Sequence, residues 1–470
     1  MTDRRCDVAV VGGGITGLTV AHALLARAPG TTVVLLEATD RLGGTIATEH
    51  TGGFVIETGA DAFLTEKPWA LDLCDRLGMA ERLVGTREGD RRTYVVHAGR
   101  LVPLPEGFML LAPTNLWALA ASPLFSWRGK LRMALDLVLP RRSGEQDESL
   151  GAFVRRRFGR EALERVAEPL LGGIYTGDVE QLSLAATMPR FRELERRDRS
   201  LILGLRATSA VRAAGARYAL FVAPADGMET LVATLARRLP EGVVRLRAPV
   251  TTLARESGQW RLVAGGASLS ADVLVLAAPA PAASAFLAPC DPTLGRLLGA
   301  IHYASSATVS LGYRAVDVPA LRGLGFVVPA RERRALLACT YSSRKFAGRA
   351  PEGFELLRTF VGGVRRPELA ALDTDALITT VRGEFRDLLG ITAAPVLTRV
   401  RHHAHAMPQY TLGHLERVAE IEQRAAGASG LVLAGAAYRG VGIPDCVRSG
   451  EAAAETALRH LAAGGKSVAV

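Results

Sequence analysis

A short strand, a glycine-rich turn and a helix open the chain, and this unit constrains the fold more than any other stretch. Residues 8–11 are apolar and mostly β-branched, which is typical of a strand buried on both faces. The turn carries Gly12, Gly14 and Gly17, which allow a tight bend, close approach of the backbone to a pyrophosphate, and close packing of helix on strand. Residues 18–27 have helical composition. The sequence therefore predicts a parallel α/β sheet that begins with a dinucleotide-binding motif.

An acidic residue follows the second predicted strand at the distance that ribose binding requires. Residues 32–36 are apolar and lead to Glu37, twenty positions after Gly17. A carboxylate there can accept both hydrogen bonds of an adenosine ribose and disfavours a 2′-phosphate, so we expect FAD or NAD(H). The chain has 49 glycines, so the glycine pattern alone would be weak evidence. The strand, the helix and the acid around it make the prediction specific.

A second glycine-rich segment separates the two cofactors. Arg41 and the pair Gly43 and Gly44 follow directly after the ribose acid, and residues 53–60 come soon afterwards. This arrangement resembles the extended FAD fingerprint of glutathione-reductase-like flavoproteins of the amine oxidase and phytoene desaturase type. In that group the second turn and its arginine lie along the diphosphate. A solvated turn is the alternative interpretation of residues 41–44, and the intact first motif disfavours it.

Length and composition bound the other possibilities. A chain of 470 residues fits two or three domains. It has no run of eighteen uncharged apolar residues, and charged residues at 3–7 lead straight into the first strand, so we expect a cytoplasmic protein without a leader or a membrane span. The five cysteines lack metal-site spacing, which predicts reduced thiols. The histidine cluster could bind a metal, but we favour a strand or loop without a ligand role for His402, His403 and His405.

The net charge of +10 comes almost entirely from arginine. Compositional bias is one explanation, because alanine and glycine are also abundant; attraction to an anionic surface or substrate is the other. Nucleic acid is not an expected partner, because no nucleic-acid-binding module is visible.

The middle of the chain changes character. Residues 94–105 read as a hairpin with Gly99 at its turn. From residue 107 onward, large apolar side chains occur in short pieces, with basic residues at 128–132 close behind. Two short helices interrupted by Gly159 follow over 149–171. The apolar pieces form either a buried helical subdomain or segments that dip into one leaflet with the basic groups at the head groups.

From residue 221 the α/β pattern returns. A buried strand at 272–279 is expected to rejoin the first sheet, and residues 300–415 form a second, sheet-containing region. The chain ends with a buried strand at 431–435, a glycine-rich loop, and a helix over 445–461. The N-terminus of that helix would bring partial positive charge to the N1/O2 edge of a flavin, which becomes anionic on reduction.

Three further segments carry a family resemblance. Residues 173–183, 407–414 and 435–446 are similar to the oxygen-dependent protoporphyrinogen oxidase family of haem biosynthesis, and the resemblance covers essentially the whole chain. Residues 60–68, 339–346 and 442–445 resemble the Gram-positive type, whose members are coproporphyrinogen III oxidases. The eukaryotic type has an arginine within the segment that corresponds to residues 59–63, and this chain has none there. Small departures occur at Ala60, where proline is usual, and at Thr176, where alanine is usual.

The resemblance implies a fold, a cofactor and a reaction. The fold is a glutathione-reductase-like, amine-oxidase-type FAD-binding Rossmann fold, with a mixed-sheet substrate domain and a helical membrane-associating domain. The expected division is an FAD domain from 1–93, 221–300 and 416–470, a helical domain at 94–217, and a substrate domain at 301–415 with part of 54–93. The reaction transfers hydride from a porphyrinogen to FAD, and dioxygen reoxidises the flavin with release of hydrogen peroxide.

The product would be coproporphyrin III, with protoporphyrin IX as the alternative. The resemblance also raises peripheral binding to the inner face of an anionic cell membrane, hand-off of the product to a ferrochelatase, and a homodimer.

The same motifs nominate site residues. The expected cofactor-binding residues are Gly12, Gly14, Ile15, Thr16, Gly17, Glu37, Ala38, Arg41, Gly43, Gly44, Gly59, Ala60, Asp61, Val250, Ala277, Gly435, Val441, Gly442 and Ile443. For the substrate, we nominate Lys67, Arg91 and Lys345 as cationic anchors for propionates and Tyr175, Met407 and Tyr410 as walls of a flat apolar slot. A surface charge or a core aromatic is the alternative for each of them. No catalytic side chain is predicted, because flavin N5 does the chemistry.

Two rival classes share the fold. Amine oxidases place an aromatic cage beside the flavin, and residues 436–443 offer only Tyr438, so an amine oxidase or carotenoid desaturase ranks second. The Rab GDP-dissociation-inhibitor type binds a prenyl chain without flavin chemistry, and the intact glycine motif with Glu37 argues against it.

Overall fold

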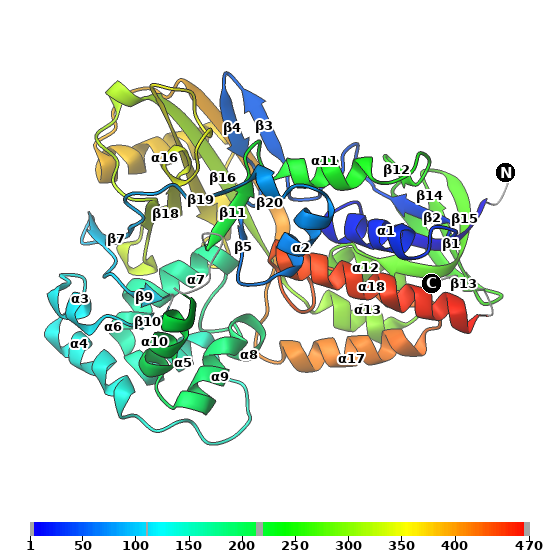
Figure 1. The fold of residues 1–470 in the computed structure, drawn as a ribbon, viewed down its shortest axis with the longest axis horizontal. Helices are drawn as coiled ribbons and strands as arrows, with labels where there is room; N and C mark the ends of the chain where they lie inside the picture. Colours follow the sequence, from blue (N-terminus) through cyan, green and yellow to red (C-terminus); the bar gives the residue numbers. More distant parts are fainter. Residues whose placement is uncertain (1–3, 110, 213–219, 465–470) are drawn as a thin grey trace.

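The computed structural model describes residues 4–109, 111–212 and 220–464. The expected domain segments also contain residues 1–3, 110, 213–217 and 465–470, which lie outside the described residues. Two large sheets and a helical region make up the molecule, with the first sheet at one end and the second sheet and helices at the other (Figure 1).

The first sheet is the dinucleotide-binding half. Its strand order is β12-β2-β1-β15-β14-β13, and β21 also pairs with β15. Strands β12, β2, β1, β15 and β21 run parallel, whereas β13, β14 and β15 form an antiparallel meander. The strands are β1 (Arg4–Val11), β2 (Val33–Leu36), β12 (Val244–Arg245), β13 (Val250–Glu256), β14 (Gln259–Ala264), β15 (Ala267–Leu276) and β21 (Leu431–Leu433).

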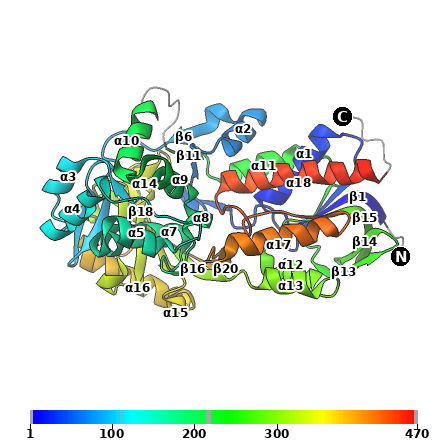
Figure 2. The ribbon, with the colours of Figure 1, turned by 90° about the horizontal axis from the view of Figure 1, so that it is seen from below.

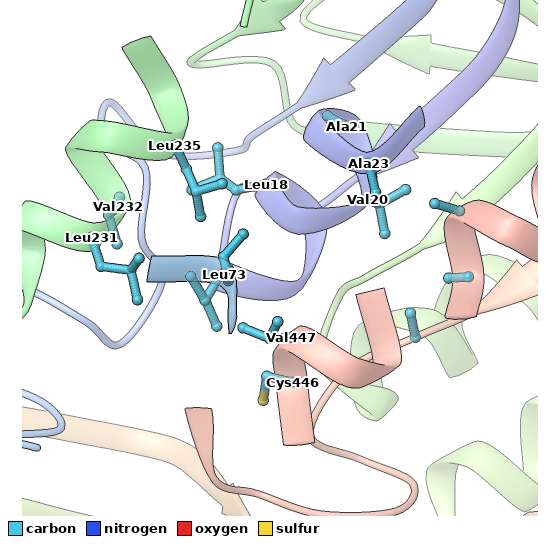
Figure 3. Packing of buried hydrophobic residues seen from close by; sticks show 14 of the residues in the cluster. Leu18, Val20, Ala21, Ala23, Leu73, Leu231, Val232, Leu235, Cys446 and Val447 are labelled. Atoms are coloured by element: carbon cyan, nitrogen blue, oxygen red, sulfur yellow. The ribbon is translucent and has the colours of Figure 1, made fainter. Parts of the chain in front are cut away.

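Helices cover both faces of this sheet, which explains the unbroken apolar run of β1. Val8 and Val10 pack on one face and Ala9 and Val11 on the other. Figure 3 shows the first face, where Leu18, Leu73, Leu231 and Val447 meet from four different helices. Those helices are α1 (Ile15–Arg27), α2 (Trp69–Arg76), α11 (Glu229–Arg237) and α18 (Ile443–Ala463); the opposite face is covered by α12 (Ala280–Leu287), α13 (Pro292–Gly299) and α17 (His414–Gly427) (Figure 2).

The second sheet is mixed and has the order β20-β16-β19-β18-β17-β7-β8. Every pairing is antiparallel except that of β17 with β7. Its elements are β7 (Thr93–His97), β8 (Arg100–Pro103), β16 (Tyr303–Arg314), β17 (Gly325–Val327), β18 (Leu336–Tyr341), β19 (Phe354–Gly362) and β20 (Leu397–Pro408), with α14 (Ser342–Lys345), α15 (Pro367–Ala370) and α16 (Thr374–Leu389). Helix α16 packs Leu377, Val381 and Phe385 against this sheet.

The hairpin at 94–105 forms as predicted, but its position differs from the expected domain division. Its turn contains Ala98 and Gly99, at φ 51° and 72°. Strand β7 pairs with β17, so the hairpin is an edge of the second sheet, whereas the division at residue 94 assigned it to the helical region. The hairpin's own residues cannot specify this partner, because any exposed strand edge offers the same backbone groups.

The helical region has its own core around Phe153, Phe158 and Leu171. The predicted interruption at Gly159 is present: this residue ends α5 at φ 89°. A fully buried ion pair, Arg157 with Asp136, joins two of its elements. The elements are α3 (Leu116–Ala121), α4 (Trp127–Ala134), η2 (Leu135–Leu137), α5 (Leu150–Phe158), α6 (Arg160–Ala162), the π-helical η3 (Leu163–Ala167), α7 (Glu168–Tyr175), α8 (Leu184–Thr187), α9 (Pro189–Asp198) and α10 (Leu201–Arg212).

Short elements complete the fold. They are the hairpin β3 (Thr48–Thr51) and β4 (Phe54–Glu57), the sheet of β5 (Phe63–Leu64), β11 (Phe221–Pro224) and β6 (Leu83–Gly85), the pair β9 (Phe108–Met109) and β10 (Ala112–Pro113), and the 3₁₀ turns η1 (Ala80–Arg82), η4 (Ala315–Asp317) and η5 (Ala330–Glu332). Within the described ranges, no helix combines the length and the apolar character needed to cross a bilayer.

Candidate active site

The first glycine turn lies at the carboxyl end of β1, where only glycine fits. Gly12 has φ 111°, and a Cβ on it would lie 2.6 Å from the carbonyl oxygen of Ala277. A Cβ on Gly17 would lie 1.9 Å from the carbonyl oxygen of Gly12. Gly14 instead faces open space and begins α1 without a side-chain cap. The uncapped N–H groups of α1 beside that space fit a diphosphate.

The Glu37 carboxylate is held against this turn. Its Oε2 accepts the N–H of Gly13 at 2.7 Å, and its Oε1 accepts the N–H and hydroxyl of Thr39 at 2.9 and 2.8 Å. A carboxylate has about four acceptor positions, so these three bonds orient Glu37 and leave capacity for a ribose hydroxyl. Ala38 lies between Glu37 and Thr39 in the chain and is therefore part of the same segment beside the turn.

The second glycine turn abuts the first. The N–H of Gly43 donates to the carbonyl of Gly13 at 2.8 Å, and Gly14 and Gly43 form an isolated bridge. Arg41 donates to three carbonyls of its own turn: those of Leu42 and Ile46, each at 3.0 Å, and that of Gly44. The predicted diphosphate residues of both motifs therefore converge at one place, and Arg41 shapes the turn.

The segment from Thr58 to Asp61 forms another side of the candidate cofactor site. A Cβ on Gly59 would lie 1.7 Å from the carbonyl oxygen of Thr45. Arg358, only 2% exposed, donates to the carbonyl of Gly59. Asp61 accepts from Lys345 Nζ at 2.7 Å. Burial raises the pKa of Asp61, but the ammonium of Lys345 and the guanidinium of Arg358 outweigh it, so the pKa lies below its ordinary value.

Sequence reasoning missed two residues that contact this segment, Arg358 and His403. Arg358 lies inside β19, and nothing in its local pattern marks it. His403, considered above only as part of a metal cluster, has its Nε2 at 2.8 Å from the carbonyl of Thr58. Because a carbonyl can only accept, Nε2 carries the proton. Burial lowers the pKa of His403, which favours the neutral ring.

The C-terminal loop brings a second uncapped helix to the same edge. Gly435 has φ 122°, and its N–H donates to Ser449 Oγ at 2.9 Å. Gly442 begins α18 without a side-chain cap. Helix α18 crosses α1 closely, since a Cβ on Gly450 would lie 2.7 Å from the carbonyl oxygen of Thr16. The start of α1 thus packs against the middle of α18, and both helices begin at the carboxyl edge of the first sheet, because β1 and β21 run parallel to β15. Ile15 and Ile443 belong to one apolar cluster, whereas Val441 packs against the core of the helical region.

Two of the nominated residues lie at the ends of strands of the first sheet: Ala277 follows β15, and Val250 begins β13. The N–H of Ala277 donates to the carbonyl of Val11 at 2.9 Å, which places Ala277 beside the first turn. Val250 starts β13 opposite Ala264, just beyond Ala248, whose N–H donates to the carbonyl of Glu37.

Both nominated lysines lie at these loops, each already paired. Lys67 Nζ is 2.5 Å from Asp445 in the first turn of α18, and Lys345 Nζ pairs with Asp61. Arg91 is separate: it is exposed and donates to the carbonyls of Thr86 and Arg87 in its own loop. The structure therefore brings two of the three nominated cations to the candidate cofactor loops.

The three residues nominated as slot walls differ in how far they are buried. Met407 is half-buried at the end of β20. Tyr175 is buried, and its hydroxyl donates to the carbonyl of Thr187 at 3.0 Å. Tyr410 is 1% exposed, so its ring presents almost no surface to a slot. Burial, with a smaller contribution from Asp445, raises the pKa of both tyrosines.

An aromatic cage is not formed by the loop residue considered for it. Tyr438 is 5% exposed and packs in the core beneath the first sheet, with a hydroxyl that has no hydrogen-bond partner in the described part of the chain. This placement disfavours an amine as substrate.

The fold and the paired glycine turns define a dinucleotide-binding flavoprotein. The family model described as flavin containing amine oxidoreductase matches residues 15–458. The chain is 35% identical to the coproporphyrinogen III oxidase of Bacillus subtilis (strain 168), over 98% of this chain and all of that one. It is 30% identical to protoporphyrinogen oxidase 1, chloroplastic, of Arabidopsis thaliana, over 96% and 87% of the two chains.

Solved structures agree. A crystal structure from Exiguobacterium sp. 255-15, described as a "putative protoporphyrinogen oxidase", superposes with a TM-score of 0.86 at 32% identity and covers 98% of this chain and all of that one. Cyclohexylamine oxidase from Brevibacterium oxydans, at 18% identity and a TM-score of 0.70, shares the fold. The chain therefore belongs to the flavin-containing amine oxidoreductase family, in the branch that contains the coproporphyrinogen III and protoporphyrinogen oxidases. The resemblance seen in the sequence and the FAD cofactor are confirmed.

Proposed function

We propose that this protein is a porphyrinogen oxidase that converts coproporphyrinogen III to coproporphyrin III. The observation that carries the proposal is identity of 35% along the whole chain to a relative with that name. The substrate loses six hydrogens in three rounds, each as a hydride and a proton. FAD supplies the hydride acceptor when it is bound, and dioxygen takes up the electrons to give three molecules of hydrogen peroxide.

In this proposal the cofactor occupies the carboxyl edge of the first sheet, where α1 and α18 both begin. Glu37 would bind the adenosine ribose, Gly14 and Gly43 would hold the diphosphate, and the segments at Gly59 and Gly442 would hold the flavin ring. Three independent features support this arrangement: the open space at Gly14, the orientation of Glu37, and the absence of capping side chains on α1 and α18.

Charge supports an anionic substrate beside that ring. Five cations, Lys67, Lys345, Arg349, Arg358 and Arg448, lie near the three carboxylates of Glu57, Asp61 and Asp445, which leaves two positive charges in excess. Coproporphyrinogen has four propionates and protoporphyrinogen has two, so the excess charge favours the former. In our proposal Lys67 and Lys345 exchange part of their carboxylate contact for a substrate propionate.

The test is anaerobic mixing of the purified holoenzyme with each porphyrinogen, followed by admission of air. Bleaching of the flavin absorbance by coproporphyrinogen, faster than by protoporphyrinogen, and formation of fluorescent porphyrin with hydrogen peroxide would support the proposal. Faster bleaching by protoporphyrinogen would change the substrate to protoporphyrinogen IX. Bleaching by neither porphyrinogen would overturn the proposal and leave an amine or a carotenoid as the alternative substrate.

We also propose that the helical region binds an anionic membrane surface. Five apolar side chains on α3, α4 and the segment after it are strongly exposed: Trp117 (87%), Trp127 (70%), Leu131 (68%), Val138 (65%) and Leu135 (47%). We call these residues the apolar patch. Lys130 Nζ lies 4.5 Å from the ring centre of Trp127, and Arg128 and Arg132 lie on the same helix. Apolar groups with basic neighbours suit the interface of an anionic bilayer. Hand-off to a ferrochelatase and a homodimer stay predictions of the resemblance.

A further inference from the structure

One tyrosine hydroxyl spans the loop that leads into α18. We call residues 435–442 the α18 loop. The hydroxyl of Tyr410 donates to the carbonyl of Ala436 at 2.6 Å and accepts the N–H of Gly440 at 2.8 Å. Two backbone groups on opposite sides of the loop are therefore satisfied by a single side chain.

A histidine holds the centre of the same loop. The ring of His414 stacks on that of Tyr410 with centroids 4.0 Å apart and planes inclined by 16°. Its Nε2 lies 2.8 Å from the carbonyl of Tyr438, so Nε2 carries the proton. Nδ1 is buried without a hydrogen-bond partner among the described residues. The ring is neutral, since burial lowers the pKa of His414 to about 4.

The loop depends on these outside partners because its own backbone is irregular. Gly435 and Gly440 have φ of 122° and 144°, which excludes a regular hydrogen-bonded element. A Cβ on Gly440 would lie 2.4 Å from Cγ of Asp445, so the loop passes directly over the first turn of α18. A displacement of the loop would therefore displace the start of that helix.

The tyrosine is itself fixed from the other side. The carbonyl of Tyr410 accepts the N–H of Ser183 at 2.8 Å, and the amide of the adjacent Gln409 donates to the carbonyl of Tyr175 at 2.9 Å. The Tyr410 segment is thus anchored to the helical region, and its side chain is a rigid support for the α18 loop.

We propose that Tyr410 and His414 are positioning residues that hold the α18 loop so that the N-terminus of α18 faces the flavin. For Tyr410, we propose this positioning role in place of the role of slot wall that the sequence suggested. The inference rests on the cofactor placement proposed above. A correctly aimed helix start stabilises negative charge on the reduced flavin, so these two side chains raise both the affinity for FAD and the reduction potential of the flavin.

The test replaces each group and follows the flavin alone. Tyr410→Phe leaves the carbonyl of Ala436 and the N–H of Gly440 unpaired. We expect the dissociation constant for FAD, measured by reconstitution of the apoprotein, to rise by roughly 5- to 50-fold. We also expect a more negative midpoint potential and an altered visible spectrum of the bound flavin. His414→Leu should act in the same direction, and His414→Gln, which can donate to Tyr438, should recover most of the affinity.

A matched control separates positioning from general stability. Tyr313 is equally buried, lies in β16 of the second sheet, packs on Phe385 of α16 and is outside the cofactor loops. Tyr313→Phe, which keeps the packing on Phe385, should leave FAD affinity and potential unchanged. The inference is wrong if Tyr410→Phe, or His414→Leu where the first variant does not fold, lowers only the melting temperature. These readouts need no porphyrinogen, so failure of the proposed substrate leaves the test intact.

Discussion

Lys67 Nζ lies 2.5 Å from Oδ2 of Asp445, so a cation nominated as a substrate anchor is paired at the first turn of α18. Lys67 is 44% exposed and Asp445 is 6% exposed. The lysine can therefore meet a ligand from solvent, while the carboxylate stays within the protein.

Lys67→Ala should raise KM for coproporphyrinogen by roughly 3- to 10-fold and KM for protoporphyrinogen by less. The reason is that the substrate with four propionates uses more cationic partners, and removal of Lys67 also leaves Asp445 to repel them. Steady-state kinetics on both substrates measure the effect, and Lys67→Arg is the control that keeps the charge. Unchanged kinetics on both substrates would remove Lys67 from the site.

Gly17→Ala should yield protein without FAD. The new Cβ would lie 1.9 Å from the carbonyl oxygen of Gly12, so the first turn must move away from the diphosphate. The ratio of flavin to protein absorbance after purification measures the loss. Gly30→Ala is the matched control, because a Cβ there meets nothing within 4 Å; it should bind FAD normally. Full flavin content in Gly17→Ala would show that the turn tolerates a side chain.

Arg157→Met should destabilise the protein by about 3–5 kcal/mol, the usual effect of breaking a buried ion pair. Arg157 and Asp136 are both fully buried. After the substitution the Asp136 carboxylate keeps the hydroxyl of Ser200 and the N–H of Ile202 as partners but has no cation to balance its charge among the described residues. Urea unfolding measures the change. Arg160→Met, which breaks an exposed pair with Glu164, should have no measurable effect; equal effects would contradict the prediction.

The free energy of unfolding should fall as pH decreases from about 6.5 to 4, in part because of His414. Burial lowers the pKa of this residue from 6.5 to about 4, with smaller contributions from Arg417 and Arg439. Between pH 6.5 and pH 4 the unfolded chain binds a proton at His414 and the folded chain does not. His414 therefore leaves the free energy of unfolding unchanged above pH 6.5 and lowers it by about 3 kcal/mol at low pH. His414→Gln should flatten this part of the profile, measured by urea unfolding at several pH values. An unchanged slope would mean that His414 is protonated when folded.

The apolar patch should bind vesicles that contain anionic lipid. Replacing Trp117, Trp127 and Leu131 with serine should reduce cosedimentation with such vesicles by about tenfold or more, because each large apolar side chain contributes about 1.5–3 kcal/mol when buried. Neutral vesicles should bind the unaltered protein less well. Val316→Ser is the control, since Val316 is 88% exposed but lies by the second sheet. Equal binding by all variants would contradict membrane docking through this patch.

Much of the cofactor site could be predicted because its parts are local in sequence. The spacing of Gly12, Gly14 and Gly17 and the acid at Glu37 describe one continuous unit, and the structure brings them together as expected. Arg358 and His403 could not be found in this way. Each is a single polar residue in a strand, and its contact with Thr58 or Gly59 joins positions about 300 to 345 residues apart.

Substrate-binding residues were harder to predict, because the type of a residue does not indicate what surrounds its side chain. An aromatic side chain such as Tyr410 has the same local pattern whether it lines a slot or supports a loop. Only the burial of its ring and the two bonds of its hydroxyl separate the alternatives. Arg91 likewise stands in the expected order along the chain but bonds within its own loop.

By itself, the sequence determined the α/β class, the FAD motif and the family, because short-range spacing of glycine, apolar and acidic residues specifies a strand, a turn and a helix in order. The tertiary structure alone decided that β7 joins the second sheet, that Lys67 meets Asp445, and that Tyr410 spans the α18 loop. Each of these contacts joins segments far apart in the chain. Their energies depend on which edges and charges the complete fold brings together, and no local pattern contains that information.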